Sequence, residues 1–298
     1  MNGPWDVSPV CAPNCAAHAV PPVPFSGTVR RAAVFSGAVG RALTDGPHLT
    51  DPVRLRSHAR ALLAALGVTL EARGIEAGPT PLSVTGTAPG ERPPGTADAP
   101  ILPTTPGTLI VLNHISWLDI VALLAVEPVT LLAKREVGRW PLVGGLARRA
   151  GTHFIDRTSP RQLPHTVAEL AALLAAGRSV VVFPQATTWC TADRGTFRRA
   201  TFQAALDAGA PVRPVTVDYA QQDRPTTVAA FCGADTFAAS LHRVLTAHGL
   251  AVRVTVHPAL PTAGRDLDRR TLAAAAERVV LGGDRVPQRA GQALGTYL

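Results

Sequence analysis

From residue 108 onward, short β-branched runs alternate with Ala- and Leu-rich stretches of helical periodicity, and no other feature constrains the fold as strongly. The expected strands are 108–112, 129–133, 152–155, 178–183, 212–218, 227–231 and 251–257, and the expected helices are 117–125, 164–176, 197–208, 236–248 and 266–280. This alternation predicts an α/β domain with a largely parallel central sheet flanked by helices. Because ligands usually bind beyond the carboxyl ends of such strands, polar residues that follow strands are the candidate site residues.

The N-terminal part has a different character. We expect residues 1–79 to form a helical arm and residues 80–298 to form the α/β domain. Residues 1–27 are Pro-rich and aperiodic, which indicates a poorly ordered or wrapped segment. Residues 51–66 have the pattern of a basic amphipathic helix, which either packs on the domain or lies on anionic lipid. Residues 85–107, dense in Pro, Gly and Thr, are expected to form a loop.

The charge balance restricts the possible partners. Lys and Arg number 29 against 21 Asp and Glu, so the formal net charge is +8, which favours phosphate-bearing partners such as an anionic membrane surface. Aromatic residues make up only 5% of the chain and no nucleic-acid-binding motif is present, so no nucleic-acid partner is expected. A serine hydrolase is also disfavoured, because the sequence has no Gly-x-Ser-x-Gly elbow.

Neither export nor a membrane span is expected. The first twenty residues contain no Lys or Arg and are broken by prolines, unlike a signal peptide. A spanning helix needs about 20 mainly apolar residues, and the best candidate, residues 118–133, is interrupted by Asp119, Glu127 and Pro128. The expected location is the cytoplasm, peripherally on the inner face of the cell membrane.

The four cysteines are too few for a disulfide scaffold in a chain of 298 residues, so reduced thiols are expected. Cys11, Cys15 and His18 have a spacing that could begin a metal site. A structural zinc site takes four ligands, and no fourth ligand follows in this part of the sequence. We therefore expect no metal.

The first candidate motif follows strand 108–112. Asn113 and His114 come directly after the strand, and Ser116 with Asp119 has the spacing of a capping box, which places His114 in the turn before a helix. Asp119 could then reach back to the imidazole and orient it as a general base. The alternative is that Asp119 only caps the helix and His114 is an ordinary turn residue.

Three further segments follow strands. Residues 151–157 end in Asp156 and Arg157, where Arg157 either binds a phosphate or forms an exposed ion pair. Residues 182–189 place the polar side chains of Gln185, Thr187 and Thr188 after a buried strand, as a binding turn or a plain loop. Residues 210–215 contain two prolines at a strand entry, which favours a pocket wall or a sheet edge.

In order and spacing, the four segments resemble the signature of the lysophospholipid acyltransferase family. That signature is Asn-His-x4-Asp, then Gly-x-x-Phe-Ile-Asp-Arg, then Phe-Pro-Glu-Gly-Thr, then a Pro-containing strand. The matching residues are Asn113, His114 and Asp119; Gly151, Phe154, Ile155, Asp156 and Arg157; Phe183, Pro184 and Thr187; and Pro211, Val212 and Pro214. The resemblance covers about residues 80–260 and implies a glycerolipid acyltransferase-like fold.

The resemblance implies a specific reaction. His114, oriented by Asp119, would deprotonate the free hydroxyl of a lysophospholipid as that hydroxyl attacks an acyl thioester. The donor would be acyl-CoA or acyl carrier protein, the acceptor would be 1-acylglycerol 3-phosphate, and no cofactor would be needed. Arg157 would bind the acceptor's phosphate, and Asn113, Gln185, Thr187 and Thr188 would line the substrate site.

The sequence departs from the family in the third block, where Gln185 and Ala186 replace Glu and Gly. Gln keeps an acceptor oxygen but lacks the charge, and Ala is unfavourable only at positive φ. We interpret the chain as a working enzyme with altered acceptor preference. The alternatives are an acyltransferase for another lyso-lipid, such as an amino-acid-containing one, and a non-catalytic lipid-binding relative.

Overall fold

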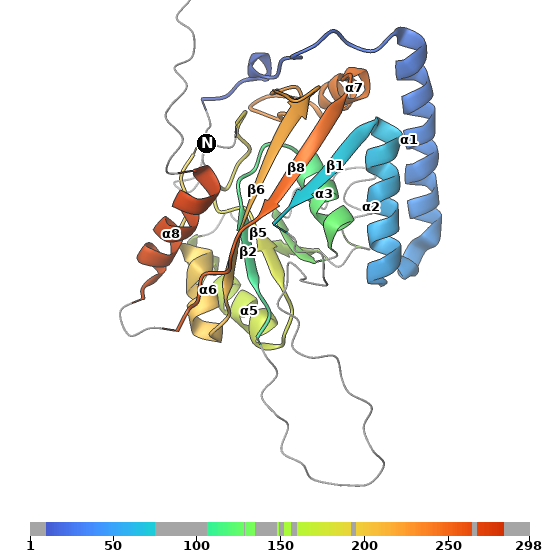
Figure 1. The fold of residues 1–298 in the computed structure, drawn as a ribbon. Coiled ribbons are helices and arrows are strands. Elements are labelled where there is room, and N and C mark those ends of the chain that lie inside the picture. The colour runs from blue at the N-terminus through green and yellow to red at the C-terminus, as the bar shows by residue number, and fades with distance from the viewer. Residues whose placement is uncertain are drawn as a thin grey trace, which may run out of the picture.

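The computed structural model describes residues 10–74, 106–127, 129–134, 148, 152–155, 160–191, 195–263 and 267–282 (Figure 1). Its helices are α1 (Phe25–Asp45), α2 (Pro52–Leu66), α3 (Leu118–Val126), α5 (Leu163–Ala175), α6 (Ala200–Ala208), α7 (Phe237–Thr246) and α8 (Arg269–Leu281). Its strands are β1 (Val68–Arg73), β2 (Leu109–Leu112), β3 (Thr130–Lys134), β4 (His153–Ile155), β5 (Val180–Val182), β6 (Val212–Gln221), β7 (Arg224–Pro225) and β8 (Leu250–Val256). Short 3-10 turns lie at Pro13–Cys15, Gly46–Thr50 and Pro160–Gln162.

One sheet organises the domain, with strand order β1-β8-β6-β2-β5-β3-β4 and β7 paired to β6. The pairs from β6 through β2, β5 and β3 to β4 are all parallel, whereas β8 runs antiparallel to β6 and parallel to β1. β2 therefore lies between β5 and β6, and the carboxyl ends of these three strands meet at one edge. The predicted α/β fold with a largely parallel sheet is confirmed.

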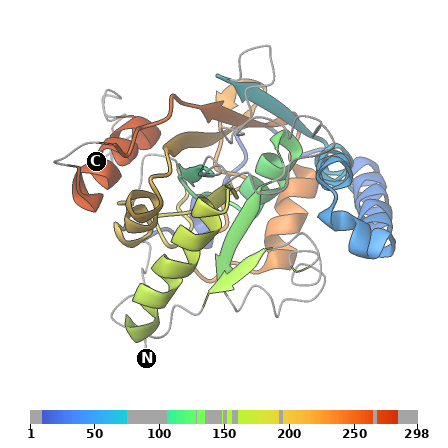
Figure 2. The same cartoon turned by 90° about the horizontal axis from the view of Figure 1, so that it is seen from below.

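Two apolar cores cover the two faces of this sheet. Along β2, Leu109 and Val111 belong to one core, whereas Ile110 and Leu112 belong to the other, because successive side chains of a strand point to opposite faces. The first core receives α5, α6 and α8, and the second receives α2, α3 and α7. In Figures 1 and 2, α8 and the α1–α2 pair lie on opposite sides of the molecule.

The amphipathic helix expected at residues 51–66 is α2. The carboxylate of Asp51 accepts hydrogen bonds from the backbone N–H of Val53 and Arg54, and Gly67 ends the helix at φ 71°. A Cβ at Gly67 would lie about 2.5 Å from the Arg31 guanidinium, so a larger residue there would displace that side chain. α2 packs between α1 and α3, so part of this helix is packed on the domain, whereas Val53 at its start is 75% exposed.

The N-terminal segment wraps along the domain from residue 10 onward. Ala17 N–H donates to Thr227 Oγ1 at 3.0 Å, Ala19 N–H to Gln221 Oε1 at 2.8 Å, and Val23 N–H to the Thr246 carbonyl at 2.9 Å. The sequence left open whether this segment is poorly ordered or wrapped on the domain, and these contacts support the wrapped form.

Several elements differ from the sequence prediction, among them the short strand β7. The strand expected at 227–231 is instead a turn whose apolar residues are buried, because a short apolar run does not distinguish a strand from a buried loop. The sequence missed β1, which lies before the expected domain boundary and joins the sheet through β8. It also missed α1, most of which follows the Pro-rich residues.

Candidate active site

His114 lies just beyond the carboxyl end of β2, the strand flanked by β5 and β6. Phe183, which follows β5, stacks on the imidazole with a centroid distance of 3.9 Å and an interplanar angle of 27°. The His114 main chain is also held from β5, because Gln185 Oε1 accepts from its N–H at 2.6 Å and its carbonyl accepts from Trp189 N–H at 2.8 Å. These contacts fix both the backbone and the ring plane of His114.

Asp119 is fully buried in the first turn of α3 and is the centre of the site. Its Oδ2 lies 2.8 Å from His114 Nδ1 and also accepts from the backbone N–H of Ile115 at 2.7 Å and of Ser116 at 2.9 Å. Its Oδ1 accepts from the Tyr219 hydroxyl at 2.6 Å. The expected contact between His114 and Asp119 is therefore present, and Asp119 also holds the turn that carries the histidine.

This hydrogen bonding assigns the tautomer of His114. An ionised carboxylate is an acceptor only, so the proton between Asp119 and His114 belongs to Nδ1. Nε2 then carries the lone pair of a base. Nε2 makes no hydrogen bond to any residue that the structure describes, and 18% of the His114 side chain is exposed. The arrangement presents an oriented imidazole base to a substrate.

Tyr219, from β6, is the residue of this site that the sequence did not reveal. Burial is the largest cause that raises the pKa of Tyr219 well above its usual value, and the charge of Asp119 and the hydrogen bond to it add to the shift. Tyr219 therefore stays a neutral donor to Asp119. Tyr219 is 100 residues away from Asp119 in the sequence and one residue beyond the end of the strand expected at 212–218. The local spacing of residues therefore could not predict its contact with Asp119.

Two residues expected to contact the substrate make structural hydrogen bonds. Asn113 is fully buried, and its side-chain amide donates to the Val217 carbonyl and accepts from the Val217 N–H, both at 2.8 Å. It therefore joins the end of β2 to β6. Gln185 is only 1% exposed, and its side-chain oxygen accepts from the backbone N–H of His114. A role of either residue in substrate binding stays a prediction.

The other expected site residues have different outcomes. The Thr188 hydroxyl donates to the Phe231 carbonyl, so it connects the loop after β5 to the turn at 227–231. Thr187 is partly buried and stays a prediction. Arg157 lies outside the described residues.

The capping box forms only in part. α3 begins at Leu118, two residues later than the start at Ser116 that the capping box predicts, and the Ser116 hydroxyl accepts from Leu118 N–H at 3.3 Å. The Asp119 half of the box is present, as its bond to Ser116 N–H shows. Asp119 therefore caps the turn and contacts the imidazole, so the two alternatives for this residue are compatible.

Comparison with protein-family models finds a match to this part of the chain. Residues 98–218 match the model of the Acyltransferase family, and this segment contains β2, β5, His114, Asp119 and Gln185. The matched segment includes the residues of all four sequence motifs.

Two curated relatives refine the comparison. A lyso-ornithine lipid O-acyltransferase from Pseudomonas aeruginosa is 38% identical over 174 residues, which cover 58% of this chain and 66% of that protein. A 1-acyl-sn-glycerol-3-phosphate acyltransferase from Neisseria gonorrhoeae is 41% identical over 113 residues, which cover 38% of this chain and 44% of that protein. The chain thus spans less than two thirds of the length of either relative.

The fold also resembles a solved structure. The 1-acyl-sn-glycerophosphate acyltransferase PlsC from Thermotoga maritima superimposes with a TM-score of 0.57 and 18% identity, covering 87% of this chain and 93% of that one. At this identity the likeness concerns the fold alone.

Ala186 stores strain that a glycine would relieve. Its φ is +63°, a conformation that costs a non-glycine residue about 1 kcal/mol or more. We expect Ala186→Gly to raise the free energy of unfolding by about 1 kcal/mol, as measured by urea denaturation. The matched control is Ala176→Gly, at φ −77° after α5, which should lower stability. A loss of stability in Ala186→Gly would contradict the assignment of strain.

Gln185 is expected to matter through its acceptor oxygen. Gln185→Leu removes the acceptor of the partly buried His114 N–H, which should cost about 1–3 kcal/mol in the free energy of unfolding. Gln185→Glu keeps an acceptor oxygen and should cost less. Exposed Gln162→Leu serves as the control and should change stability by no more than about 0.5 kcal/mol. Equal losses in the Leu and Glu variants would show that the hydrogen bond is unimportant.

Proposed function

We propose that this protein transfers an acyl group from an acyl thioester to the free hydroxyl of a lysophospholipid. The observation that carries the proposal is the His114 imidazole, whose Nδ1 is held by buried Asp119 while Nε2 is left as a base. The family match and the names of the relatives support the same class of reaction.

The geometry supports a direct transfer. The acceptor hydroxyl gives its proton to His114 Nε2 as its oxygen attacks the thioester carbonyl, and a tetrahedral intermediate forms. The carbon–sulfur bond then breaks, and the thiolate leaves and takes the proton back from the imidazolium. Asp119 stabilises the imidazolium in between, in the way a buried carboxylate does in other His–Asp pairs. No acyl-enzyme and no cofactor are required.

The acceptor proposed first is 1-acylglycerol 3-phosphate, which would yield phosphatidic acid. The Neisseria relative is named for that acceptor, and Arg157 of the second motif is the residue that would bind its phosphate. A lyso-ornithine lipid is the second candidate, because the Pseudomonas relative carries that name and aligns over a longer segment. The donor is acyl-CoA or acyl carrier protein.

A non-catalytic role is less well supported than the sequence alone indicated. Its best argument was the altered third block, but Gln185 keeps the acceptor oxygen that binds the His114 N–H. The charge lost with glutamate is therefore not needed for this contact. The hydrogen bond between His114 and Asp119, which a general base of this kind needs, is also present.

We further infer that the protein works at an anionic membrane surface. No helix among the described residues is long and apolar enough to cross a bilayer. The α1–α2 pair on one side of the molecule exposes large apolar side chains, with Phe25 84% and Val53 75% exposed (Figure 1). Exposed Arg30 on α1 adds a positive charge near an apolar surface, which is a combination that binds anionic lipid interfaces.

Acyl transfer is tested with palmitoyl-CoA or an acylated carrier protein as donor and with lysophosphatidic acid or lyso-ornithine lipid as acceptor. The acylated lipid is quantified by mass spectrometry, because free cysteines of the chain would react with a thiol reagent. We expect product with at least one combination, and a loss of about 100-fold or more in His114→Ala, because a general base contributes that much.

His58→Ala serves as the control, because His58 pairs with Asp45 between α1 and α2 and takes no part in the site. It should keep the activity of the wild type. Full activity in His114→Ala would remove His114 from the mechanism. Absence of product with every donor and acceptor, from a folded protein, would favour the lipid-binding alternative.

Membrane binding is tested by co-sedimentation with vesicles. We expect binding to phosphatidylglycerol vesicles, weaker binding to phosphatidylcholine vesicles, and about tenfold weaker binding for Phe25→Asp or Val53→Asp, because each removes an apolar side chain from the interface. The control is Leu163→Asp on α5, which also replaces an exposed apolar residue. Equal losses in all three variants would contradict a specific face.

A further inference from the structure

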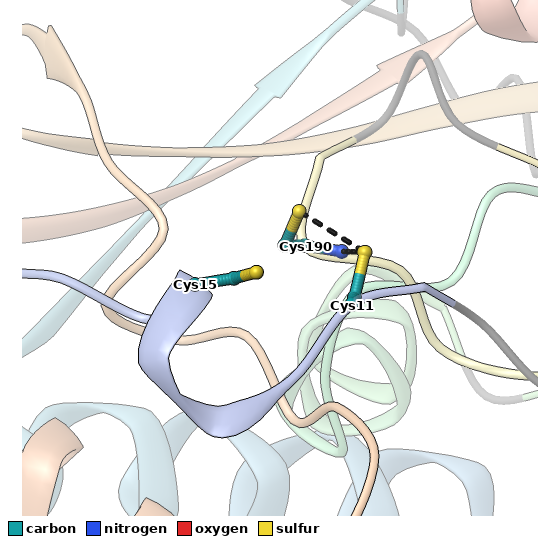
Figure 3. Close-up of side chains that lie close together, drawn as sticks. All are labelled: Cys11, Cys15 and Cys190. Atoms are coloured by element: carbon teal, nitrogen blue, oxygen red, sulfur yellow. Dashed lines mark hydrogen bonds between the residues drawn. The ribbon is translucent and has the colours of Figure 1, made fainter. Parts of the chain in front are cut away.

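Three of the four cysteines of the chain come together, although Cys190 lies 175 residues beyond Cys15 in the sequence. Figure 3 shows Cys11 and Cys15 of the N-terminal segment beside Cys190 of the loop after β5. One sulfur from each of these three residues lies within 4.8 Å of the other two. Cys232, from the turn after β7, belongs to the same buried apolar cluster as Cys11 and Cys190.

Cys232 lies beside the group, in the same buried cluster as Cys11 and Cys190, although its sulfur is not one of the three that lie within 4.8 Å of one another. The backbone beside Cys232 is close to Cys11, since a Cβ at Gly233 would lie 3.0 Å from the Cys11 carbonyl oxygen. Gly233 has φ +62°, so this position favours glycine on both counts. The turn at 232–233 is thus fitted against the Cys11 segment.

The sulfur positions match a metal site better than a disulfide. The Cys11 and Cys190 sulfurs are 3.2 Å apart, against about 2.05 Å in a disulfide. Two thiolates on one tetrahedral Zn²⁺, each at about 2.3 Å, lie about 3.8 Å apart. The spacing of the three sulfurs is of this order. The N–H of Cys190 also donates to Cys11 Sγ at 3.4 Å, which holds the two residues together.

We propose that the four cysteines bind one Zn²⁺ ion through their sulfur atoms in a closed tetrahedral site. Four thiolates without an open position are the donor set of structural zinc. On binding, four S–H bonds break, four Zn–S bonds form, and four protons pass to solvent without any electron transfer. His18, which the sequence spacing put beside Cys11 and Cys15, is not part of the group, and its neighbours include Arg243 and His242.

The site would position the active-site loops without touching the reacting atoms. The loop that carries Cys190 also carries Trp189, whose N–H donates to the His114 carbonyl. The turn that carries Cys232 also carries Phe231, whose N–H donates to the Ile115 carbonyl at 2.9 Å. A zinc ion would therefore tie the N-terminal segment to both loops that hold the backbone around the histidine.

The test is the metal content of the full chain purified under reducing conditions without an affinity tag that binds metals. We expect about one zinc per chain by mass spectrometry of the elements. Replacement by Co²⁺ should give thiolate-to-cobalt charge-transfer absorption and the strong visible bands of a tetrahedral site. Both readouts concern the wild type, so they do not depend on the folding of any variant or on acyl transfer.

Variants assign the ligands. Serine substitutions of Cys11, Cys15, Cys190 and Cys232, made one at a time, should each lower zinc retention against a chelator by at least about tenfold. His18→Ala is the matched control and should retain zinc as the wild type does. Loss of zinc in His18→Ala, with retention in one cysteine variant, would overturn the four-cysteine assignment.

Three results on the wild type would overturn the proposal. The first is a folded, metal-free protein that takes up neither Zn²⁺ nor Co²⁺ and whose four thiols all remain free. The second is a disulfide between Cys11 and Cys190, detected as a mass lower by two hydrogens. The third is iron in place of zinc. Because none of these readouts involves a lipid substrate, failure here is separate from failure of the proposed acyl transfer.

Discussion

The site depends on the buried carboxylate of Asp119. Four donors surround it, from His114, from the backbone of Ile115 and Ser116, and from Tyr219. A buried carboxylate is costly unless such partners satisfy it. The same hydrogen bonds that compensate for its burial shape the turn after β2, fix the imidazole tautomer and join that turn to β6. The shape of the turn and the orientation of the base therefore both depend on the Asp119 carboxylate, and we expect the loss of any one donor to disturb both.

The strand order explains why the donors can converge. β2 is the central strand of the parallel part of the sheet, with β5 on one side and β6 on the other. Residues that follow β5 therefore reach the His114 backbone and ring, while β6 supplies Val217 to Asn113 and Tyr219 to Asp119. Asn113 and Gln185 thus hold the backbone around His114 through hydrogen bonds. A neutral glutamine can make the bond to the His114 N–H, because that bond needs an acceptor oxygen and not a charge.

Local patterns were sufficient for the main elements. The apolar runs of β2, β5 and β8 predicted their strands to within one or two residues. The spacing of His114 and Asp119 left open whether Asp119 contacts the imidazole or only caps the helix, and the resemblance to the family favoured the contact. The missing parts depend on long-range packing. Tyr219 acts across 100 residues of sequence, and β1 becomes a strand only by pairing with β8. The buried turn at 227–231 has strand-like composition but packs under the N-terminal segment.

The cysteines illustrate the same limit and its consequence. In the sequence, Cys11 and Cys15 lacked a fourth ligand because the remaining thiols are more than 170 residues away. The fold places those thiols on the loop after β5 and on the turn after β7, which also contact the backbone of His114 and Ile115. Hydrogen bonds of the N-terminal segment to Thr227 and Gln221 bring it to the same side of the domain. A segment whose regular structure before α1 is one short 3-10 turn is thereby joined to the two loops that contact the backbone around the histidine.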